Sequence, residues 1–144
     1  MSALRVLFLG GTGIISSACA GRAVESGLDL SVVNRGKTSI RPLPADARQI
    51  TADLDDPATI AAVAVLDFDV VVDWMAFTPD QVRARTDALR GHVGQYVFIS
   101  SASAYQTPPA RLPITESTPL RNPFWQYSRD KIACEDLLTT LYRD

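Results

Sequence analysis

The stretch at residues 4–17 constrains the fold of this chain more strongly than any other feature of its sequence. An uninterrupted apolar run, residues 6–9, is followed by Gly10, Gly11 and Gly13 and then by a run of small residues. Such an apolar run is typical of a parallel strand that is covered on both faces. Glycines permit a sharp turn, and the N–H groups at the start of the next helix attract an anion. The stretch therefore predicts a strand, a phosphate-binding turn and a helix, in that order.

Strands and helices alternate along the rest of the chain. Further strands are expected at residues 28–33, 48–52, 68–74 and 95–100, and helices at 14–26, from Pro57, at 79–90 and at 123–142. This alternation predicts an α/β fold, a three-layer, doubly wound parallel sheet with helices on both faces. Right-handed crossovers and a switch point after the first strand predict the strand order 3-2-1-4-5. The whole chain, residues 1–144, is expected to form one domain.

The residues best suited to bind a ligand follow the carboxyl ends of the expected strands. Ligands bind doubly wound sheets at this edge. The residues in question are the glycine turn at 10–13, Asn34 with Arg35, residues 53–54, Ala76 and Ser101. Their placement predicts a ligand site at the carboxyl edge of the sheet, with the glycine turn as its anion-binding part.

Composition and charge argue against several classes of function. The formal net charge of −2 gives no general attraction to nucleic acid or to an anionic membrane. No apolar run approaches the ~20 residues of a membrane-spanning helix, and the N-terminal run is too short for a signal peptide. His92 is the only histidine, which argues against a histidine-based metal site and a Ser-His-Asp triad. Cys19 and Cys134 are expected to be reduced core residues of a cytoplasmic protein, and no metal site is predicted.

Three segments carry a resemblance to a known family. They are a glycine motif at residues 9–16, a serine-rich segment at 97–105 and the Tyr-x-x-x-Lys motif of Tyr127 and Lys131. Together they resemble the extended short-chain dehydrogenase/reductase family, which includes NAD(P)-dependent epimerases, dehydratases and sugar-nucleotide reductases. The resemblance covers the whole chain but only the N-terminal half of such a protein. It implies a Rossmann fold that binds NAD or NADP. The chain is then either a fragment of a longer enzyme or a minimal cofactor-binding domain.

The glycine motif matches part of the family fingerprint Thr-Gly-x-x-Gly-x-x-Gly. Gly10 and Gly13 match its first two glycines. Ser16 replaces the third glycine, which lets the helix pack closely against the strand. The resemblance implies that this turn contacts the cofactor pyrophosphate through Gly10, Gly11, Thr12, Gly13, Ile14 and Ile15. A tight turn without a ligand is the alternative.

The residues after the second and third strands face the adenosine end of the cofactor in this family. Asn34 stands where an acidic residue would bind the ribose of NAD, and Arg35 and Lys37 follow it. Two cations without an opposing carboxylate favour NADP over NAD, unless both are simply solvated loop residues. Asp53 and Leu54 match an acid–aliphatic pair beside the adenine, although Asp53 could equally cap a helix.

The catalytic residues of the family match Ser101, Tyr127 and Lys131. The spacing of four places Tyr127 and Lys131 on one helix face, and an ammonium beside a phenol favours the phenolate. The resemblance implies that Tyr127 exchanges a proton with the substrate, Ser101 holds the substrate oxygen, and Lys131 also binds the nicotinamide ribose. Ser103 is a second candidate for the hydroxyl, and the small Ala76 leaves room for the cofactor. An ordinary serine-rich loop and a solvated Tyr–Lys pair are the alternatives.

The function that the resemblance implies is that of an NAD(P)-dependent epimerase, dehydratase or reductase acting on a small molecule such as a nucleotide sugar. By itself the chain is expected to bind cofactor with little turnover. A non-catalytic NAD(P)-binding sensor or regulatory module is the alternative. Family members often dimerise through the helices after strands four and five, so segments 79–90 and 123–142 are the expected homodimer helices. Trp74 is expected to belong to the core or a pocket wall rather than to the catalytic residues. Phe124 and Trp125 are expected to pack, with shielding of the nicotinamide site as the alternative.

Overall fold

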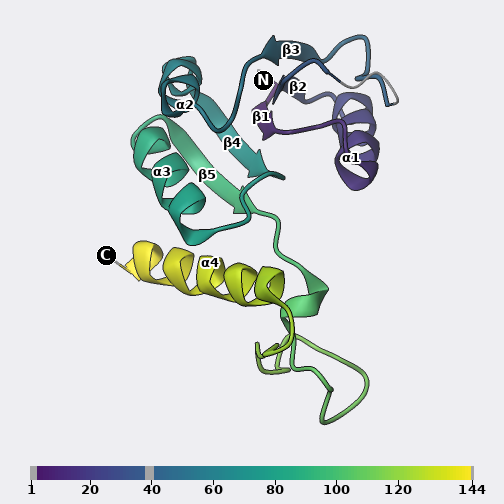
Figure 1. Ribbon diagram of the computed structural model, residues 1–144. Coiled ribbons are helices and arrows are strands. Elements are labelled where there is room, and N and C mark those ends of the chain that lie inside the picture. The colour runs from purple at the N-terminus through teal and green to yellow at the C-terminus, as the bar shows by residue number, and fades with distance from the viewer. Residues whose placement is uncertain (1–2, 38–40, 144) are drawn as a thin grey trace. The chain divides into compact units, whose positions relative to one another are not determined.

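The computed structural model describes residues 3–37 and 41–143 of the chain. Strands and helices alternate along these residues, as predicted (Figure 1). In chain order they are β1 (Arg5–Leu9), α1 (Ile14–Glu25), β2 (Asp29–Asn34), β3 (Arg48–Thr51), α2 (Pro57–Ala64), β4 (Phe68–Asp73), α3 (Pro79–Leu89), β5 (Val93–Phe98), a short 3-10 helix η1 (Ala102–Ala104) and α4 (Gln126–Arg143). They form two compact units. The sheet unit comprises residues up to 75 and residues 85–99, and the α4 unit comprises residues 76–84 and those from 100 onward.

The five strands of the sheet unit form one parallel sheet in the order β3-β2-β1-β4-β5, which confirms the predicted order 3-2-1-4-5. Val6 of the central strand pairs with Leu30 of β2 on one side and with Val70 of β4 on the other. β3 and β5 lie at the two edges. The carboxyl ends of all five strands therefore point the same way, as the predicted site requires.

Apolar side chains cover both faces of this sheet. On one face, Leu7 belongs to a buried cluster that includes Ile60 of α2. On the other face, Phe8 belongs to a second cluster that includes Ala20 of α1. Burying one leucine side chain contributes roughly 1.5–3 kcal/mol, so both clusters stabilise the sheet substantially. This two-sided covering is the reason for the uninterrupted apolar run in β1.

Two elements begin more than one residue away from the predicted positions. β5 covers Val93–Phe98, two residues earlier than the expected 95–100, because Phe68 at the start of β4 pairs with Val93. α4 begins at Gln126 instead of residue 123. The side-chain oxygen of Asn122 accepts a hydrogen bond from the Phe124 N–H at 3.1 Å and holds residues 122–124 in a turn before the helix. In both places a long-range or side-chain contact fixes a boundary that sequence periodicity does not contain.

The long loop between η1 and α4 is held by backbone hydrogen bonds within the α4 unit. Tyr105 and Leu120 form an isolated antiparallel bridge, and the Gln106 N–H donates to the Pro119 carbonyl at 2.8 Å. The loop therefore returns to the start of α4 close to η1. Among the described residues, no helix is long and apolar enough to cross a membrane.

Candidate functional site

The glycine turn after β1 has the geometry that the sequence predicts. Gly10 has a φ of +86°, in the left-handed region that favours glycine. A Cβ on Gly10 would lie 2.6 Å from Cγ of Met75, and one on Gly11 would lie 2.5 Å from Cγ1 of Val32. Neither position has room for a side chain. The two glycines let the chain leave β1 in close contact with β2 and with the segment that follows β4.

Ser16 takes up a role of its own in this turn. Its hydroxyl accepts a hydrogen bond from the Gly13 N–H at 3.0 Å, and the residue is buried. Serine in place of the third glycine thus fits into the turn and occupies one of its donors. The first turn of α1 carries no acidic side chain, and Ile14 and Ile15 are 75% and 68% exposed. The start of α1 is therefore open and free of negative side-chain charge.

The residues expected at the adenosine end are exposed or make local contacts. Asn34 Oδ1 accepts from the Gly36 N–H at 2.9 Å and from Gln49 Nε2 at 3.0 Å, so it fixes the loop after β2. The side chains of Arg35 and Lys37 are exposed. Asn34 is thus committed to loop structure, while the two cations face solvent.

Asp53 and Leu54 follow β3 in the sheet unit. Asp53 Oδ1 accepts from the Asp55 N–H at 3.1 Å, and Leu54 packs against the cluster that contains Leu7. The helix cap belongs to Asp56, as expected, since its carboxylate accepts from the Ala58 N–H at 2.9 Å. The alternative of a capping role for Asp53 is therefore wrong.

Sequence reasoning missed a buried ionic network at the end of β4. Asp73 is fully buried and Arg85 is 3% exposed. Arg85 Nη1 lies 2.7 and 2.9 Å from the two carboxylate oxygens of Asp73, which also accept from the Tyr96 hydroxyl at 2.7 Å and from the Met75 N–H at 2.9 Å. An aspartate at the end of the apolar run Phe-Asp-Val-Val-Val-Asp was the available signal. The network fixes the backbone that packs against Gly10.

Trp74 packs as expected, next to this network. Its ring meets that of Phe8 edge-on, with centroids 5.5 Å apart. The indole nitrogen is buried and has no hydrogen-bond partner among the described residues. Trp74 therefore acts as part of the core on the α1 face of the sheet.

Tyr127 and Lys131 lie on α4, one helical turn apart. Lys131 is 2% exposed, and its Nζ donates to the Ala76 carbonyl at 2.7 Å. The same nitrogen lies 5.0 Å from the ring centroid of Phe77 and 5.7 Å from that of Tyr127. An ammonium over two aromatic faces is held electrostatically. The structure thus gives Lys131 a buried, oriented position, which excludes the alternative of a solvated Tyr–Lys pair.

Two further aromatic rings surround Tyr127 within the α4 unit. Its ring centroid lies 4.8 Å from that of Trp125 and 6.3 Å from that of Phe77. Phe124, by contrast, is 73% exposed, so the expectation that it packs is wrong. Its position in the capped turn before α4 turns the ring outward instead. Ordinary aromatic contacts therefore fix the ring of Tyr127 on two sides.

Ser101 and Ser103 are linked to α4 by hydroxyl contacts. Ser101 Oγ lies 2.8 Å from Ser103 Oγ, and the Ser128 hydroxyl donates to Ser103 Oγ at 2.8 Å. Ser128 is fully buried beside Tyr127 in the sequence. The neighbouring Ser100 hydroxyl donates to the carboxylate of Glu135, also on α4. The segment with the predicted active-site hydroxyl is thus tied to the helix that carries Tyr127 and Lys131.

The predicted residues fall into two groups. The glycine turn, Asn34, Arg35, Lys37 and residues 53–54 lie in the sheet unit, whereas Ala76, Ser101, Tyr127 and Lys131 lie in the α4 unit. Within the α4 unit the structure brings Ala76, Tyr127 and Lys131 into contact. Ser128 and Ser103 connect Ser101 to the same helix.

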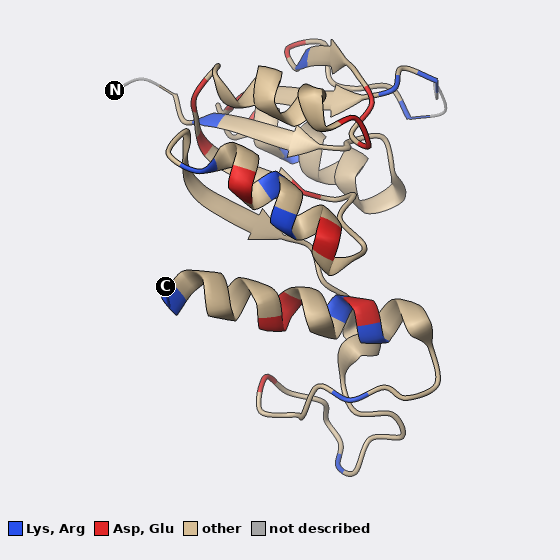
Figure 2. Ribbon diagram, turned by 60° about the vertical axis from the view of Figure 1, so that its left-hand side comes forward, with Lys and Arg blue, Asp and Glu red and all other residues tan. Residues whose placement is uncertain are grey.

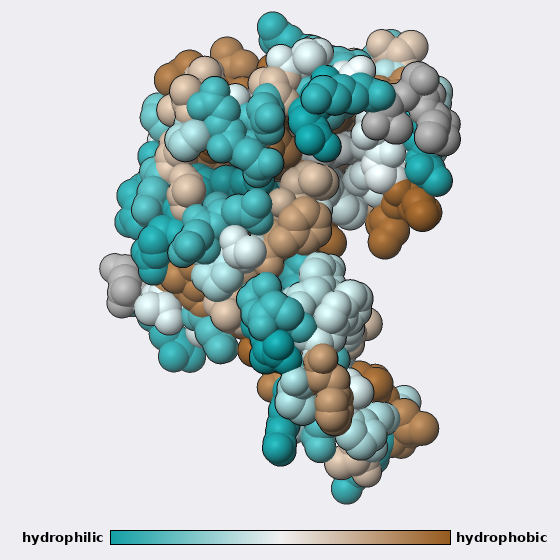
Figure 3. Space-filling model, viewed as in Figure 1, coloured by the Kyte–Doolittle hydropathy of each residue, from teal (hydrophilic) through white to brown (hydrophobic). Residues whose placement is uncertain are grey.

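Surface properties show where the charges and apolar side chains lie. Acidic and basic residues are interspersed along α3 and α4 (Figure 2). These helices therefore carry no basic stripe of the kind that binds nucleic acid. The face drawn in Figure 3 is largely hydrophilic with small apolar patches. Exposed apolar residues include Ile14 and Ile15 of the glycine turn and Phe124 and Trp125 before Tyr127.

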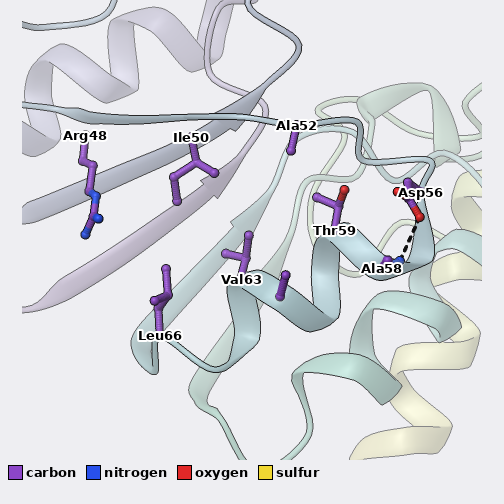
Figure 4. A pocket seen from close by; sticks show the side chains of 9 residues that line it. Arg48, Ile50, Ala52, Asp56, Ala58, Thr59, Val63 and Leu66 are labelled. Carbon is purple, nitrogen blue, oxygen red and sulfur yellow. Dashed lines mark hydrogen bonds between the residues drawn. The ribbon is translucent and has the colours of Figure 1, made fainter.

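A separate hollow of about 440 Å³ lies in the sheet unit between β3 and α2. Ile50, Val63 and Leu66 form its apolar wall, and Arg48 and Asp56 stand at its rim (Figure 4). Asp56 is occupied with capping α2. None of the residues predicted to bind cofactor or substrate lines this hollow.

Comparison with known proteins shows which proteins are similar in sequence to this chain. No family model matches the sequence. UDP-glucose 4-epimerases of Corynebacterium glutamicum and Streptomyces lividans are each 30% identical over 155 residues, covering 95% and 94% of this chain and 46% of each relative. The chain is a relative of the UDP-glucose 4-epimerases. It corresponds to the N-terminal Rossmann part of such NAD-dependent epimerase/dehydratase proteins and spans about half the length of the curated relatives it matches. The predicted resemblance to the extended short-chain dehydrogenase/reductase family is confirmed.

Solved epimerase structures have the same fold. The UDP-glucose 4-epimerase of Bifidobacterium longum in complex with NAD+ and UDP matches with a TM-score of 0.78 at 23% identity, over 96% of this chain and 49% of that chain. The UDP-glucose 4-epimerase of Brucella ovis in complex with NAD matches with a TM-score of 0.79 at 24% identity, over 96% and 47%. The Rossmann fold is therefore confirmed. Both relatives are described with NAD, so the expectation of NADP over NAD draws no support from them.

Proposed function

We propose that this chain is the cofactor-binding, proton-transferring half of an NAD-dependent epimerase or dehydratase that acts on a nucleotide sugar or a similar hydroxyl or carbonyl substrate. The observation that carries the proposal is the position of Lys131. It is 2% exposed, is oriented by the Ala76 carbonyl, and lies one helical turn from Tyr127. Its Nζ lies 5.7 Å from the ring centroid of Tyr127, and a cation held beside a tyrosine is an arrangement suited to proton transfer by that tyrosine.

The residues around the glycine turn fit a dinucleotide. The start of α1 is open and free of acidic side chains, which suits a pyrophosphate. The residues that would hold the cofactor are Gly10 to Ile15 at the pyrophosphate, residues 34–37 and 53–54 at the adenosine, and Ala76 and Lys131 at the nicotinamide ribose. When bound, the nicotinamide supplies hydride transfer. The exposed side chains of Ile14 and Ile15 add apolar surface at the proposed pyrophosphate position.

Side chains of the α4 unit have separate roles in the proposed proton transfer. Tyr127 exchanges a proton with the reacting hydroxyl or carbonyl oxygen of the substrate. Lys131 places its positive charge one helical turn from that tyrosine and is itself held by the Ala76 carbonyl at 2.7 Å. Ser101 donates a hydrogen bond to the substrate oxygen. The rings of Phe77 and Trp125 lie next to the tyrosine ring and limit its movement.

We propose NAD as the cofactor, because solved relatives with a bound cofactor, including those of Bifidobacterium longum and Brucella ovis, are described with NAD. Titration with NADH and NADPH, followed by nicotinamide fluorescence, tests this choice. Tighter binding of NADH supports it. Tighter binding of NADPH that is lost in Arg35→Ala would contradict it and restore a role for the exposed cations after β2. Lys37→Ala is the companion variant in the same loop.

The Tyr127→Phe variant tests the catalytic part of the proposal. It should bind NADH with unchanged affinity, since the phenol hydroxyl is not needed to hold the cofactor, and lose hydride transfer to or from substrate. The chain by itself is expected to turn over little. The sensitive assay is therefore a single turnover at saturating NAD with UDP-glucose as the probe substrate. If NADH binds but Tyr127→Phe changes no measured function, a non-catalytic sensor or regulatory module is the better description.

A further inference from the structure

Four polar side chains in the α4 unit form a connected hydrogen-bond chain. Asn122 Nδ2 lies 3.3 Å from Ser128 Oγ, Ser128 Oγ lies 2.8 Å from Ser103 Oγ, and Ser103 Oγ lies 2.8 Å from Ser101 Oγ. Asn122 and Ser128 are buried, and Ser103 and Ser101 are half-buried. The chain thus runs from a buried amide to the hydroxyl that the proposed function assigns to the substrate oxygen.

The orientation of the Asn122 amide is fixed by its backbone partners. Its oxygen accepts from the Phe124 N–H at 3.1 Å, and a backbone N–H can only donate. Its nitrogen donates to the Ser103 carbonyl at 2.9 Å, and a carbonyl can only accept. The nitrogen therefore faces Ser128 and donates to its hydroxyl oxygen. The amide cannot be reversed without losing both backbone bonds.

The fixed Asn122 amide determines which hydroxyl donates and which accepts along the hydrogen-bond chain. Ser128 accepts from Asn122, so its own proton goes to Ser103 Oγ. Among residues 3–37 and 41–143, the remaining hydroxyl partner of Ser103 is Ser101, which receives the Ser103 proton. Ser101 Oγ also accepts from the Ser103 N–H at 3.2 Å. A hydroxyl has two acceptor positions and one donor. Both acceptor positions of Ser101 are filled, and only its donor remains.

We infer that Asn122, Ser128 and Ser103 form a directed hydrogen-bond chain that leaves the Ser101 hydroxyl free to donate and holds it in that orientation. The inference rests on the proposed function and adds the residues that position this donor toward the substrate oxygen. Ser128 and Ser103 act as positioning residues because they reach the substrate only through Ser101. Cooperative polarisation along the chain strengthens the final donor.

Neutron diffraction from deuterium-exchanged crystals of the full chain tests the direction. Deuterium is expected on Ser128 Oγ pointing to Ser103 and on Ser103 Oγ pointing to Ser101. Deuterium on Ser101 Oγ that points to Ser103 would overturn the inference. In Asn122→Asp the carboxylate accepts from Ser128, so the same map should show the Ser128 deuteron turned away from Ser103. An unchanged map for Asn122→Asp would also overturn it.

Kinetics distinguish positioning from mere packing. Ser128→Ala should slow single-turnover hydride transfer about tenfold, the effect of roughly one hydrogen bond, and leave NADH affinity unchanged. Ser128→Thr, which keeps the hydroxyl, should restore the rate. If the wild-type protein binds no NAD(H), the proposed function is wrong, but the neutron test of the hydrogen-bond direction still applies. A chain that binds NADH but has the reversed deuterium pattern defeats this inference alone.

Discussion

The buried network of Asp73, Arg85 and Tyr96 yields the sharpest stability prediction. Arg85→Leu removes the cation and leaves the Asp73 carboxylate, which is fully buried, with fewer partners. Removing one member of a buried ion pair costs about 3–5 kcal/mol, because the remaining charge stays out of water. A typical domain has a free energy of unfolding of about 5–15 kcal/mol. Arg85→Leu is therefore expected to leave the sheet unit marginally stable.

Companion variants separate the contributions to this network. Tyr96→Phe removes one hydrogen bond to a charged acceptor, for which the expected cost is about 1.5–3 kcal/mol. The double variant Asp73→Asn with Arg85→Leu removes both charges and should cost clearly less than the two single losses added together. Arg90→Leu is the matched control, since Arg90 is 73% exposed and its pairing with Asp87 at 3.8 Å should contribute ~1 kcal/mol or less.

Urea unfolding measures these differences by linear extrapolation. Trp74 follows the network directly in sequence and packs against Phe8, so its fluorescence reports on the sheet unit. A Trp125→Phe background removes the other indole of the chain. Two results would refute the reasoning: a loss for Arg85→Leu no larger than that for Arg90→Leu, or additive losses in the double variant. Either would mean that Asp73 does not depend on Arg85 for its compensation.

Three further predictions concern other parts of the chain. Gly10→Ala should weaken NADH binding and lower the free energy of unfolding by about 1–3 kcal/mol, because its φ of +86° and the missing space both oppose a side chain; unchanged urea midpoint and affinity would contradict this. Partial burial and the carboxylates of Glu116 and Glu135 raise the pKa of Tyr105 above its ordinary value. The neutral phenol therefore contributes to the free energy of unfolding at neutral pH, and this contribution is lost as the pH rises above ~10. Glu116→Gln should lower that pKa, as phenolate absorbance would record, and no change would rule out the assigned cause. Dimerisation through segments 79–90 and 123–142 predicts twice the monomer mass in light scattering, and a single species of monomer mass would exclude it.

Local sequence patterns were sufficient for the architecture. The apolar run of β1 and the glycines after it predict the central strand and its turn, since both depend on neighbours in sequence. The strand order follows from chain direction and handedness. The spacing of Tyr127 and Lys131 predicts a shared helix face because helical geometry is local. Where the physics is local, the sequence was a sound guide.

Contacts between distant residues were beyond the reach of such patterns. Nothing near Asp73 in sequence identifies Arg85 and Tyr96 as its partners, which are 12 and 23 positions away. The link between Ser103 and Ser128 spans 25 positions. Ser128 looks like an ordinary residue between Tyr127 and Arg129 until the fold buries it. The start of α4 was misjudged for a similar reason, since the side chain of Asn122 ends the preceding turn.

The hydrogen bond between Ser16 and Gly13 has a consequence for ligand competition. The Gly13 N–H, which a pyrophosphate would use, already has an acceptor supplied by the chain itself. An incoming anion must displace the Ser16 hydroxyl to reach that donor, whereas a turn with glycine at this position offers the donor unopposed. Under the proposed function, the Ser16 hydroxyl therefore competes with the cofactor for this donor. We expect the serine to keep the empty turn in shape and to lower the affinity for the cofactor.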